Sequence, residues 1–335
     1  MKQLTILVLF IVPVLASAQT TVEETDKTIS LSTPQLSAGV KKTEYVTGIA
    51  AGTFVDKKTG FHDPGFGLDI VDWIMEPGSD EAYRDTLPKE MVYQFNNAWH
   101  GKGAKRTIEG PQICTQAKTL APTVIKGEDF VAIKTDYHYK TAAPGMKAGS
   151  KWEQTMVFPV GKRFFISSDT ITSVNDLTNP FLRLDMPGHI KHKGADSFSE
   201  VYLSYVGKIP AAEFEKNFAP DEKFTYQRGK NEMPKRFIRA YHLRDAKTGK
   251  DGPWLAGMTL KPEVVTEAWC HERGYVCMIE EFGPVAGKAI KAGDSFSAAY
   301  VVGYFDSIEE MEKVYDQYAG AVEVTASEKG WKLLP

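Results

Sequence analysis

The densest group of side chains that could carry chemistry lies in RLDMPGHIKHKGADSF, residues 183–198. His189 and His192 are three residues apart, with Asp185 before them and Asp196 after them. A Pro-Gly step predicts a loop here, and loops on a rigid scaffold often carry function. Imidazole suits a general base or a metal ligand, because its pKa lies near neutrality. We take His189 and His192 as candidate catalytic residues; a metal pair and a solvated turn are the alternatives.

A second group of candidates lies in residues 263–282, which have the pattern of a β-hairpin. A turn at the Arg-Gly step would place Glu267 opposite Glu280 and Trp269 opposite Met278. Two opposed carboxylates repel, so such a pair has one raised pKa, holds a cation or grips sugar hydroxyls. Glycoside hydrolysis also needs two carboxylates. Glu267 is therefore a catalytic candidate and Trp269 a substrate-binding candidate, unless the glutamates are simply exposed to solvent.

A third group lies in the strand-like segment RFIRAYHLR, residues 236–244, where Arg239 and Tyr241 share one face. A strand that buries arginine beside tyrosine is unusual unless the guanidinium meets a carboxylate. That carboxylate could belong to a uronic acid or to an internal Asp or Glu. We list Tyr241 as a candidate proton carrier, and Arg239 and Arg236 as candidate substrate-binding residues.

The loop-like segment FNNAWHGKG, residues 95–103, adds Trp99 and His100. An aromatic face beside polar groups suits the apolar C–H surface of a sugar ring. Both are therefore substrate-binding candidates, with a core anchor as the alternative for Trp99.

Residues 1–18 have the pattern of a signal peptide. Lys2 gives a positive start, Leu4 to Leu15 is apolar, and Ala16-Ser17-Ala18 is a small-residue cleavage site. The apolar stretch of 12 residues is shorter than the about 20 that cross a membrane. The sequence therefore predicts an exported protein, periplasmic or secreted, without a membrane span.

Export would permit disulfides. The hairpin register described above places Cys270 opposite Cys277, so the sequence allows either a local bridge or two buried thiols. Cys114 has no evident partner.

The elements that must position these residues are predicted to be β-strands. Residues 19–43 are polar and indicate a loosely held arm, whereas 44–335 contain short β-branched and aromatic runs separated by turn residues. One segment, 307–319, has an apolar stripe at helical spacing, with Asp306 and Glu309 as a capping pair. The fold class is therefore all-β: a large antiparallel β-sandwich in a single domain with one C-terminal helix.

Composition excludes several classes of function. The formal net charge is −3 and the isoelectric point about 6.2. Nucleic acid is therefore not expected as a partner, because duplex binding needs clustered Lys and Arg. The chain lacks a P-loop, a GxGxxG, a GxSxG and an HExxH. We predict neither a cofactor nor a bound metal, and the oligomeric state stays open.

Two stretches give the chain a family resemblance. DKKTGFHDPG and KWEQTMVFPVGKRFFISSDTITSVND resemble the β-supersandwich proteins of the galactose mutarotase type. That superfamily also includes domains of polysaccharide lyases and glycoside hydrolases. The later stretches DMPGHIKHKG, EAWCHERGYVCMIEEFG and GYFDSIEEMEKVYD look like a secreted bacterial family within it. The resemblance covers roughly residues 40–325. Mutarotases use a His and a Glu on the concave sheet face, but no motif here assigns those roles to particular residues.

Together these features predict an exported carbohydrate-active enzyme: a polysaccharide lyase, an epimerase or a glycosidase-like protein with a carbohydrate ligand. His189 or Tyr241 would carry the proton and Arg239 would hold a substrate carboxylate. A non-catalytic carbohydrate-binding or surface-assembly protein on the same fold is the alternative. Convergence of the candidate residues around one site separates the two.

Overall fold

A computed structural model describes residues 20–44, 46, 48–63, 67–68, 71–80, 83–92, 105–192, 196–214, 224–272 and 274–335. The predicted signal peptide and the candidates Trp99 and His100 lie outside these described residues. In the described part, no helix is long and apolar enough to span a membrane.

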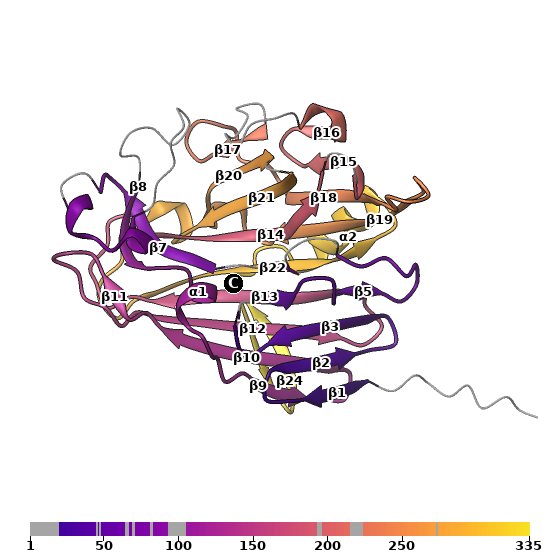
Figure 1. Cartoon of the computed structure of the whole chain (residues 1–335), viewed down its shortest axis with the longest axis horizontal. Helices are drawn as coiled ribbons and strands as arrows, with labels where there is room; N and C mark the ends of the chain where they lie inside the picture. Colours follow the sequence, from indigo (N-terminus) through magenta and orange to yellow (C-terminus); the bar gives the residue numbers. More distant parts are fainter. Residues whose placement is uncertain are drawn as a thin grey trace, which may run out of the picture.

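Three antiparallel sheets make up most of the fold (Figure 1). The nine-stranded sheet has the order β16-β15-β18-β19-β22-β13-β12-β10-β9. Its strands are β9 (Thr123–Lys126), β10 (Phe130–His138), β12 (Lys151–Pro159), β13 (Phe164–Thr172), β15 (Phe198–Leu203), β16 (Gly207–Pro210), β18 (Phe237–Arg244), β19 (Asp251–Thr259) and β22 (Ser295–Phe305).

The seven-stranded sheet has the order β11-β8-β7-β14-β21-β20-β17. Its strands are β7 (Val71–Pro77), β8 (Lys105–Gly110), β11 (Thr141–Ala142), β14 (Phe181–Lys191), β17 (Tyr226–Gln227), β20 (Val265–Glu272) and β21 (Tyr275–Phe282). The six-stranded sheet contains β1 (Thr21–Glu24), β2 (Thr28–Ser32), β3 (Leu36–Lys41), β4 (Ile49–Ala50), β5 (Val55–Asp56) and β6 (Gly67–Leu68).

The remaining elements are short. They are α1 (Ile113–Gln116), α2 (Ile308–Tyr318), the hairpin β23 (Glu323–Ser327) with β24 (Gly330–Leu334), and 3₁₀ turns at Arg84–Thr86, Lys89–Met91, Ala211–Glu213, Pro262–Val264 and Val285–Gly287.

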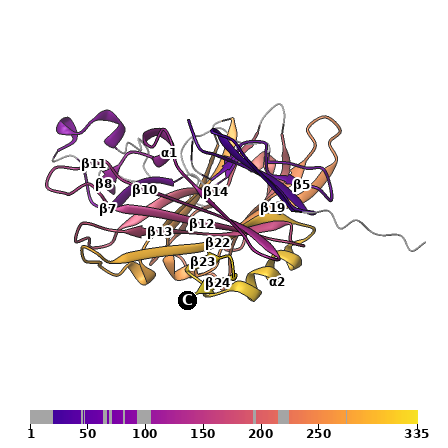
Figure 2. The same ribbon diagram turned by 90° about the horizontal axis from the view of Figure 1, so that it is seen from below.

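The six- and seven-stranded sheets pack on the same side of the nine-stranded sheet. One continuous core joins all three, with Ile29 from β2, Leu184 from β14 and Phe165 from β13 among its members. Helix α2 and the β23–β24 hairpin cover the opposite side of the nine-stranded sheet, as Figure 2 shows. This arrangement confirms the predicted all-β sandwich with one long helix.

Helix α2 confirms the predicted stripe, but its N-cap is Ser307, one residue later than the predicted cap Asp306. Ser307 is the N-cap, since its hydroxyl accepts a hydrogen bond from the Glu310 backbone N–H at 3.2 Å. Glu310 in turn accepts from the Asp306 backbone N–H at 2.6 Å, which ties the residue before the N-cap to the first turn. Met311 and Tyr315 are buried against the nine-stranded sheet.

The predicted loose arm over residues 19–43 is wrong. Residues of this segment form β1, β2 and β3, and alternate positions of β2 and β3 are buried in the common core. Ile29 and Leu31 alternate with Ser30 and Ser32 in the period of two that a half-buried strand requires. The polar composition of the segment reflects its solvent-facing side.

The possible Cys270–Cys277 disulfide is also excluded. Residue 270 pairs with Met278 rather than with Cys277, because the hairpin register differs by one residue from the expected one. A shift of one residue turns every side chain to the other face. Cys270 therefore lies in the core between the sheets, Cys277 lies on the outer face, and both are free thiols.

A buried ion pair links the two large sheets. Arg239 of β18 is fully buried, and its Nη2 lies 3.1 Å from Glu280 Oε2 of β21. The guanidinium also donates to the backbone oxygens of Ile279 at 2.6 Å and Met186 at 3.1 Å. Thr259 donates a hydrogen bond to Glu280. This placement favours the internal carboxylate over a uronate as the partner of Arg239.

We expect Arg239→Met to lower the free energy of unfolding by about 3–5 kcal/mol, because it leaves the Glu280 carboxylate buried without its counter-charge. Urea denaturation measures the loss. The double variant Arg239→Met/Glu280→Leu removes both charges and should recover much of the stability. A loss below about 1 kcal/mol in the single variant would contradict a buried pair.

Candidate functional site

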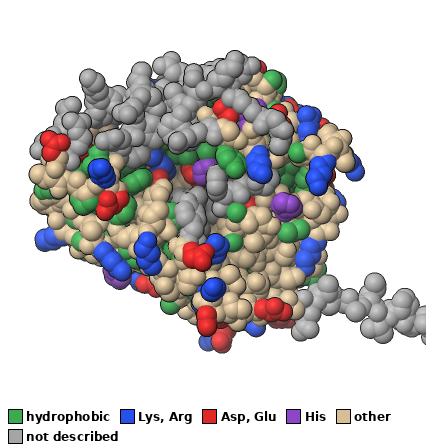
Figure 3. Space-filling model, in the orientation of Figure 1, with side chains coloured by type: hydrophobic (Ala, Val, Ile, Leu, Met, Phe, Trp, Pro, Cys, Tyr) green, Lys and Arg blue, Asp and Glu red, His purple; other side chains and the backbone are tan. Residues whose placement is uncertain are grey.

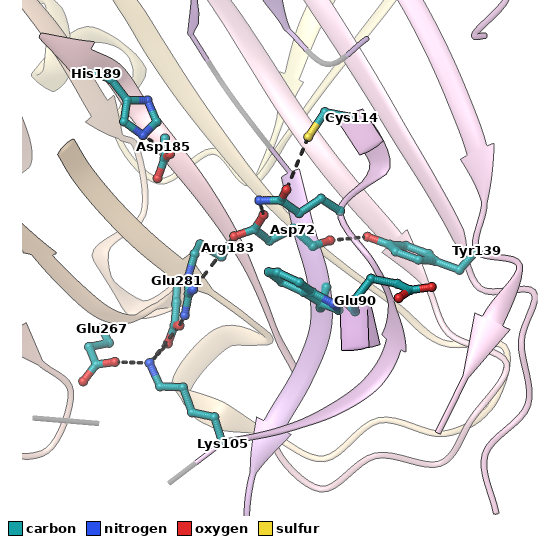
Figure 4. A network of polar contacts seen from close by, with 12 residues as sticks. Asp72, Glu90, Lys105, Cys114, Tyr139, Arg183, Asp185, His189, Glu267 and Glu281 are labelled. Atoms are coloured by element: carbon teal, nitrogen blue, oxygen red, sulfur yellow. Dashed lines mark hydrogen bonds and ion pairs between the residues drawn. The ribbon is translucent and has the colours of Figure 1, made fainter. Parts of the chain in front are cut away.

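The outer face of the seven-stranded sheet carries a continuous network of charged side chains. On β14, Leu182 and Leu184 point into the core, so the intervening Arg183 points outward. Seven further residues place their side chains on this face, and all but Trp269 are shown from close by in Figure 4. They are Asp72 of β7, Lys105 of β8, Asp185 and His189 of β14, Glu281 of β21, and Glu267 and Trp269 of β20.

Glu281 is the centre of this network. Its two carboxylate oxygens each accept a hydrogen bond from Lys105 Nζ at 2.8 Å, and one of them also accepts from Arg183. Lys105 contacts Glu267 as well, so one ammonium bridges two carboxylates. The Trp269 ring lies 4.6 Å from Lys105 Nζ and 4.9 Å from the Arg183 guanidinium carbon, a cation–π arrangement with both cations.

The two glutamates respond to this environment in opposite directions. Burial acts to raise the pKa of Glu281, but Lys105 and Arg183 outweigh it and hold that pKa below its usual value. Burial raises the pKa of Glu267, which Lys105 opposes and the neighbouring Glu281 reinforces. Glu281 therefore carries a charge near neutral pH, whereas Glu267 is the more easily protonated of the pair.

Asp72 is a second group with an altered proton affinity. Its carboxylate accepts a hydrogen bond from Gln112 and lies 3.9 Å from Arg183 Nη1. Burial raises the pKa of Asp72 to about 7, although Arg183 opposes the rise. Asp72 thus exchanges its proton near neutral pH, which a general acid or base must do.

A bulge in β14 brings Asp185 and His189 together. Asp185 pairs with Ile279 and His189 with Cys277, so four steps along β14 span two steps along β21. Gly188 within the bulge has φ of +116°, a conformation that glycine adopts readily. In a regular strand four residues span about 13 Å. Here His189 Nε2 lies 2.8 Å from Asp185 Oδ2.

The Asp185 carboxylate controls the protonation of His189. Burial acts to lower the pKa of His189, but the charge and hydrogen bond of Asp185 outweigh it, so the pKa lies above 6.5. A carboxylate that accepts from one imidazole nitrogen also fixes the ring orientation and stabilises the protonated ring. His189 and Asp185 therefore form an acid–base dyad.

The bulge itself is supported from the core by two of the predicted site residues. Arg239 Nη2 donates to the Met186 carbonyl at 3.1 Å, and the Tyr241 hydroxyl donates to the Gly188 carbonyl at 3.1 Å. Tyr241 also donates to Val276 O at 2.9 Å and is fully buried, and burial raises its pKa well above 10. Arg239 and Tyr241 thus lie behind the network, where neither faces a ligand on the outer surface.

The structure brings together three of the predicted residues and separates the others. His189, Glu267 and Trp269 share the outer face of the seven-stranded sheet. His192 is buried elsewhere, with Nε2 2.8 Å from Phe214 O and Nδ1 3.3 Å from Asp196. Arg236 lies on the far side of the nine-stranded sheet and donates to both Asp316 oxygens at 2.7 Å.

The predicted carboxylate pair needs one correction. Glu267 lies opposite Glu281 and not opposite Glu280, because of the register difference described above. Glu280 belongs to the buried pair with Arg239.

Sequence reasoning missed Lys105, Arg183, Asp72 and Glu281. A usable signal existed for two of them: Arg183 and Asp185 alternate with Leu in FLRLDM, and Glu281 ends the apolar run CMIEEF. Charged residues at alternate positions of an otherwise apolar strand indicate a functional face. Lys105 and Asp72 stand in no such pattern.

No arrangement of three or more His, Cys, Asp or Glu side chains suited to a metal ion occurs among the described residues. Chemically, the network offers two proton carriers, Asp72 with a pKa of about 7 and His189 with a raised pKa, beside two cations held by carboxylates. Figure 3 shows this side of the molecule, with a hollow near its centre.

Comparison with known proteins gives matches in structure alone. No family model and no curated protein matches the chain. A putative aldose 1-epimerase from Escherichia coli K12 is 9% identical, with 86% of this chain and 100% of that chain covered and a TM-score of 0.43. Galactose 1-epimerase from Lactobacillus acidophilus NCFM is 8% identical, with 86% and 99% covered and a TM-score of 0.45.

A third similar structure is larger. Alpha-N-acetylgalactosaminidase from Bifidobacterium bifidum is 14% identical, with a TM-score of 0.42, and the match covers 63% of this chain and 32% of that one. The neighbours are thus galactose mutarotase-like or glycosidase structures, and a functional assignment has to come from the site itself.

Asp72 gives a prediction about stability and pH. Its pKa is 3.8 in the unfolded reference and about 7 in the folded protein. The folded state therefore binds this proton more tightly, and the resulting stability is present below about pH 4 and lost as the pH rises to about 7. We therefore expect the free energy of unfolding of Asp72→Asn to fall by roughly 2–4 kcal/mol less than that of the wild type over this pH rise.

Urea denaturation at pH 5 and pH 8 checks this, with the exposed Asp129→Asn as the matched control. An Asp72→Asn protein that loses as much stability between the two pH values as the wild type would contradict the raised pKa.

Proposed function

We propose that this protein is a carbohydrate-active enzyme of the epimerase type that moves protons on a neutral sugar at the outer face of the seven-stranded sheet. The observation that carries the proposal is the His189–Asp185 dyad, with 2.8 Å between Nε2 and Oδ2, on the face that also holds Asp72. His189 is the group that exchanges a proton with the sugar, and Asp185 orients and charges it. The sugar itself is inferred from the resemblance of the sequence to the galactose mutarotase type.

The charge balance of the network supports a neutral substrate over a uronate. Lys105 and Arg183 contribute two positive charges, and three carboxylates, those of Glu267, Glu281 and Asp72, lie within ion-pair distance of them; the fourth carboxylate, Asp185, contacts His189. A uronate clamp needs a cation that is free to meet the substrate carboxylate. Both cations here are engaged by protein carboxylates, so the carboxylate of a uronate substrate would meet net repulsion.

The same geometry argues against glycoside hydrolysis by the glutamate pair. A glycosidase keeps the space between its two carboxylates for the glycosidic bond and a water or sugar carbon. Here Lys105 Nζ lies between Glu267 and Glu281 and binds both. Proton exchange at His189 requires no such space.

Interconversion of sugar anomers needs one group to accept the proton of the anomeric hydroxyl and another to donate to the ring oxygen. A group with a pKa near the working pH is effective in either role. His189 in its neutral form accepts, and Asp72 is the second group on the face that exchanges a proton near pH 7. The export of the protein, inferred from residues 1–18, would place this activity in the periplasm or outside the cell.

His189→Asn is expected to lower kcat/KM about 100-fold or more, because it removes the general base and keeps a side chain that can still accept a hydrogen bond. Polarimetry on freshly dissolved α-D-galactose and α-D-glucose measures the activity. His138→Asn, at an exposed position of the other sheet, is the matched control.

Unsaturated products from uronate polymers, followed by ultraviolet absorbance, would instead support a lyase. Sugar binding without turnover in the wild type would identify a non-catalytic binding protein and overturn the proposal.

Asp185→Asn is expected to move the acidic limb of the pH–rate profile to lower pH. The Asp185 carboxylate raises the pKa of His189, so its loss lets the neutral imidazole persist at lower pH. The maximal rate should fall as well, because the ring loses its orienting partner. An acidic limb that stays in place would show that His189 is not the titrating base.

A further inference from the structure

A polar groove lies on the far side of the sandwich from the charged network. It has a volume of about 400 Å³ on the outer face of the nine-stranded sheet, and it is lined by β9, β10, β12, β13 and one edge of β23. The volume falls in the range of about 300–1,000 Å³ that small-molecule sites occupy. In Figure 2, β23 and β24 lie beneath the strands that form its floor.

The sequence of the outer face creates this groove. At one end of β10 and β12 the outward residues are apolar, and Phe130, Ala132 and Val157 are covered by the β23–β24 hairpin. Farther along the same strands the outward residues become polar. On β10 they are Lys134 and Asp136 and on β12 they are Thr155 and Glu153, facing each other in register. The hairpin stops covering the sheet where this change occurs, and its edge forms a wall.

One hydroxyl in the floor is available to a ligand. Thr155 is only 8% exposed, and it lies between Lys134 of β10 and Ser168 of β13 on one rung of the sheet. Ser168 uses its hydroxyl to accept from the Val324 backbone N–H at 3.0 Å. The Thr155 hydroxyl makes no hydrogen bond within the described part of the chain. The hydroxyl is not among the fully buried polar atoms, so it is open to the groove, where a ligand can bond to it.

The charges of the lining specify the ligand further. Asp136, Glu153 and Glu323 face a single ammonium group in the lining, that of Lys134. Lys151 pairs with Glu153 at 2.7 Å. Among the described residues no ion pair reaches Asp136 or Glu323. The groove therefore offers hydrogen-bond acceptors and a negative charge, and its lining contains hydroxyls but no aromatic side chain.

We propose that this groove is a binding site for a polyhydroxylated ligand that carries a protonated amine, namely an amino-sugar oligosaccharide. Sugar hydroxyls donate to the carboxylates and bond to Thr155, and the ammonium group complements Asp136 and Glu323. The site is separate from the His189 dyad, and the inference does not depend on the proposed enzymatic function.

Titration calorimetry of the full chain tests the proposal with three probes. Deacetylated chitotriose carries both hydroxyls and amines, N-acetylated chitotriose keeps the hydroxyls without the charge, and spermidine has the charge without hydroxyls. We expect the deacetylated trisaccharide to bind about tenfold or more tightly than either of the others. Equal binding of spermidine would overturn the proposal and leave an anionic surface that attracts any cation.

Thr155→Val tests the hydroxyl without endangering the fold, because it replaces a hydroxyl that bonds to no described residue by a methyl group of the same shape. We expect the melting temperature to stay the same or rise and the affinity for deacetylated chitotriose to fall about fivefold. Thr172→Val on the same face, outside the groove, is the matched control.

Unchanged affinity in Thr155→Val would overturn the proposed floor contact. The His189→Asn variant must keep the binding; if it loses the binding, the oligosaccharide occupies the other site and the groove proposal fails while the proposed enzymatic site gains a ligand.

Discussion

The Glu281 carboxylate sets the chemistry of the outer face. Two cations from different strands, Lys105 of β8 and Arg183 of β14, converge on this one group in a buried position. A buried ion is tolerated only when it is paired and hydrogen-bonded, so the three side chains hold one another in place. Glu267 and Asp72 then compete for cations that are already engaged. Their raised pKa values follow from burial that these engaged cations do not offset.

Because side chains alternate along β21, the adjacent residues Glu280 and Glu281 point to opposite faces of the sheet and have different roles. Glu280 points inward and meets Arg239 between the sheets, whereas Glu281 points outward and joins the network. The sequence pattern EE in CMIEEF indicated two carboxylates but not which one points to the outer face of the sheet. The direction of each side chain depends on the hairpin register. A turn that is longer by one residue shifts every pair in the hairpin. The register also decides that Cys270 and Cys277 lie on opposite faces.

Local sequence patterns were therefore sufficient to predict the helix and most strands, but insufficient to predict which residues form the site. Helix α2 follows from its own apolar stripe and capping residues, and the strand content follows from the spacing of turns and β-branched runs. The predicted arm over residues 19–43 was wrong because composition outweighed the alternation visible at Ile29 and Leu31. Lys105 is separated from Glu267 by 162 positions. Contacts of that kind arise from strand order, which a single sequence does not specify.

The bulge at Met186–Gly188 is the point where the segment 183–198 contacts the segment 236–244. An irregular strand leaves carbonyl groups outside the ladder, and buried carbonyls need donors. Arg239 and Tyr241 of β18 supply them from the core, at Met186 O and Gly188 O. They thereby stabilise the conformation that holds His189 beside Asp185 on the opposite face. Arg239 and Tyr241 thus serve the site as positioning residues, because the dyad exists only while the bulge keeps its shape.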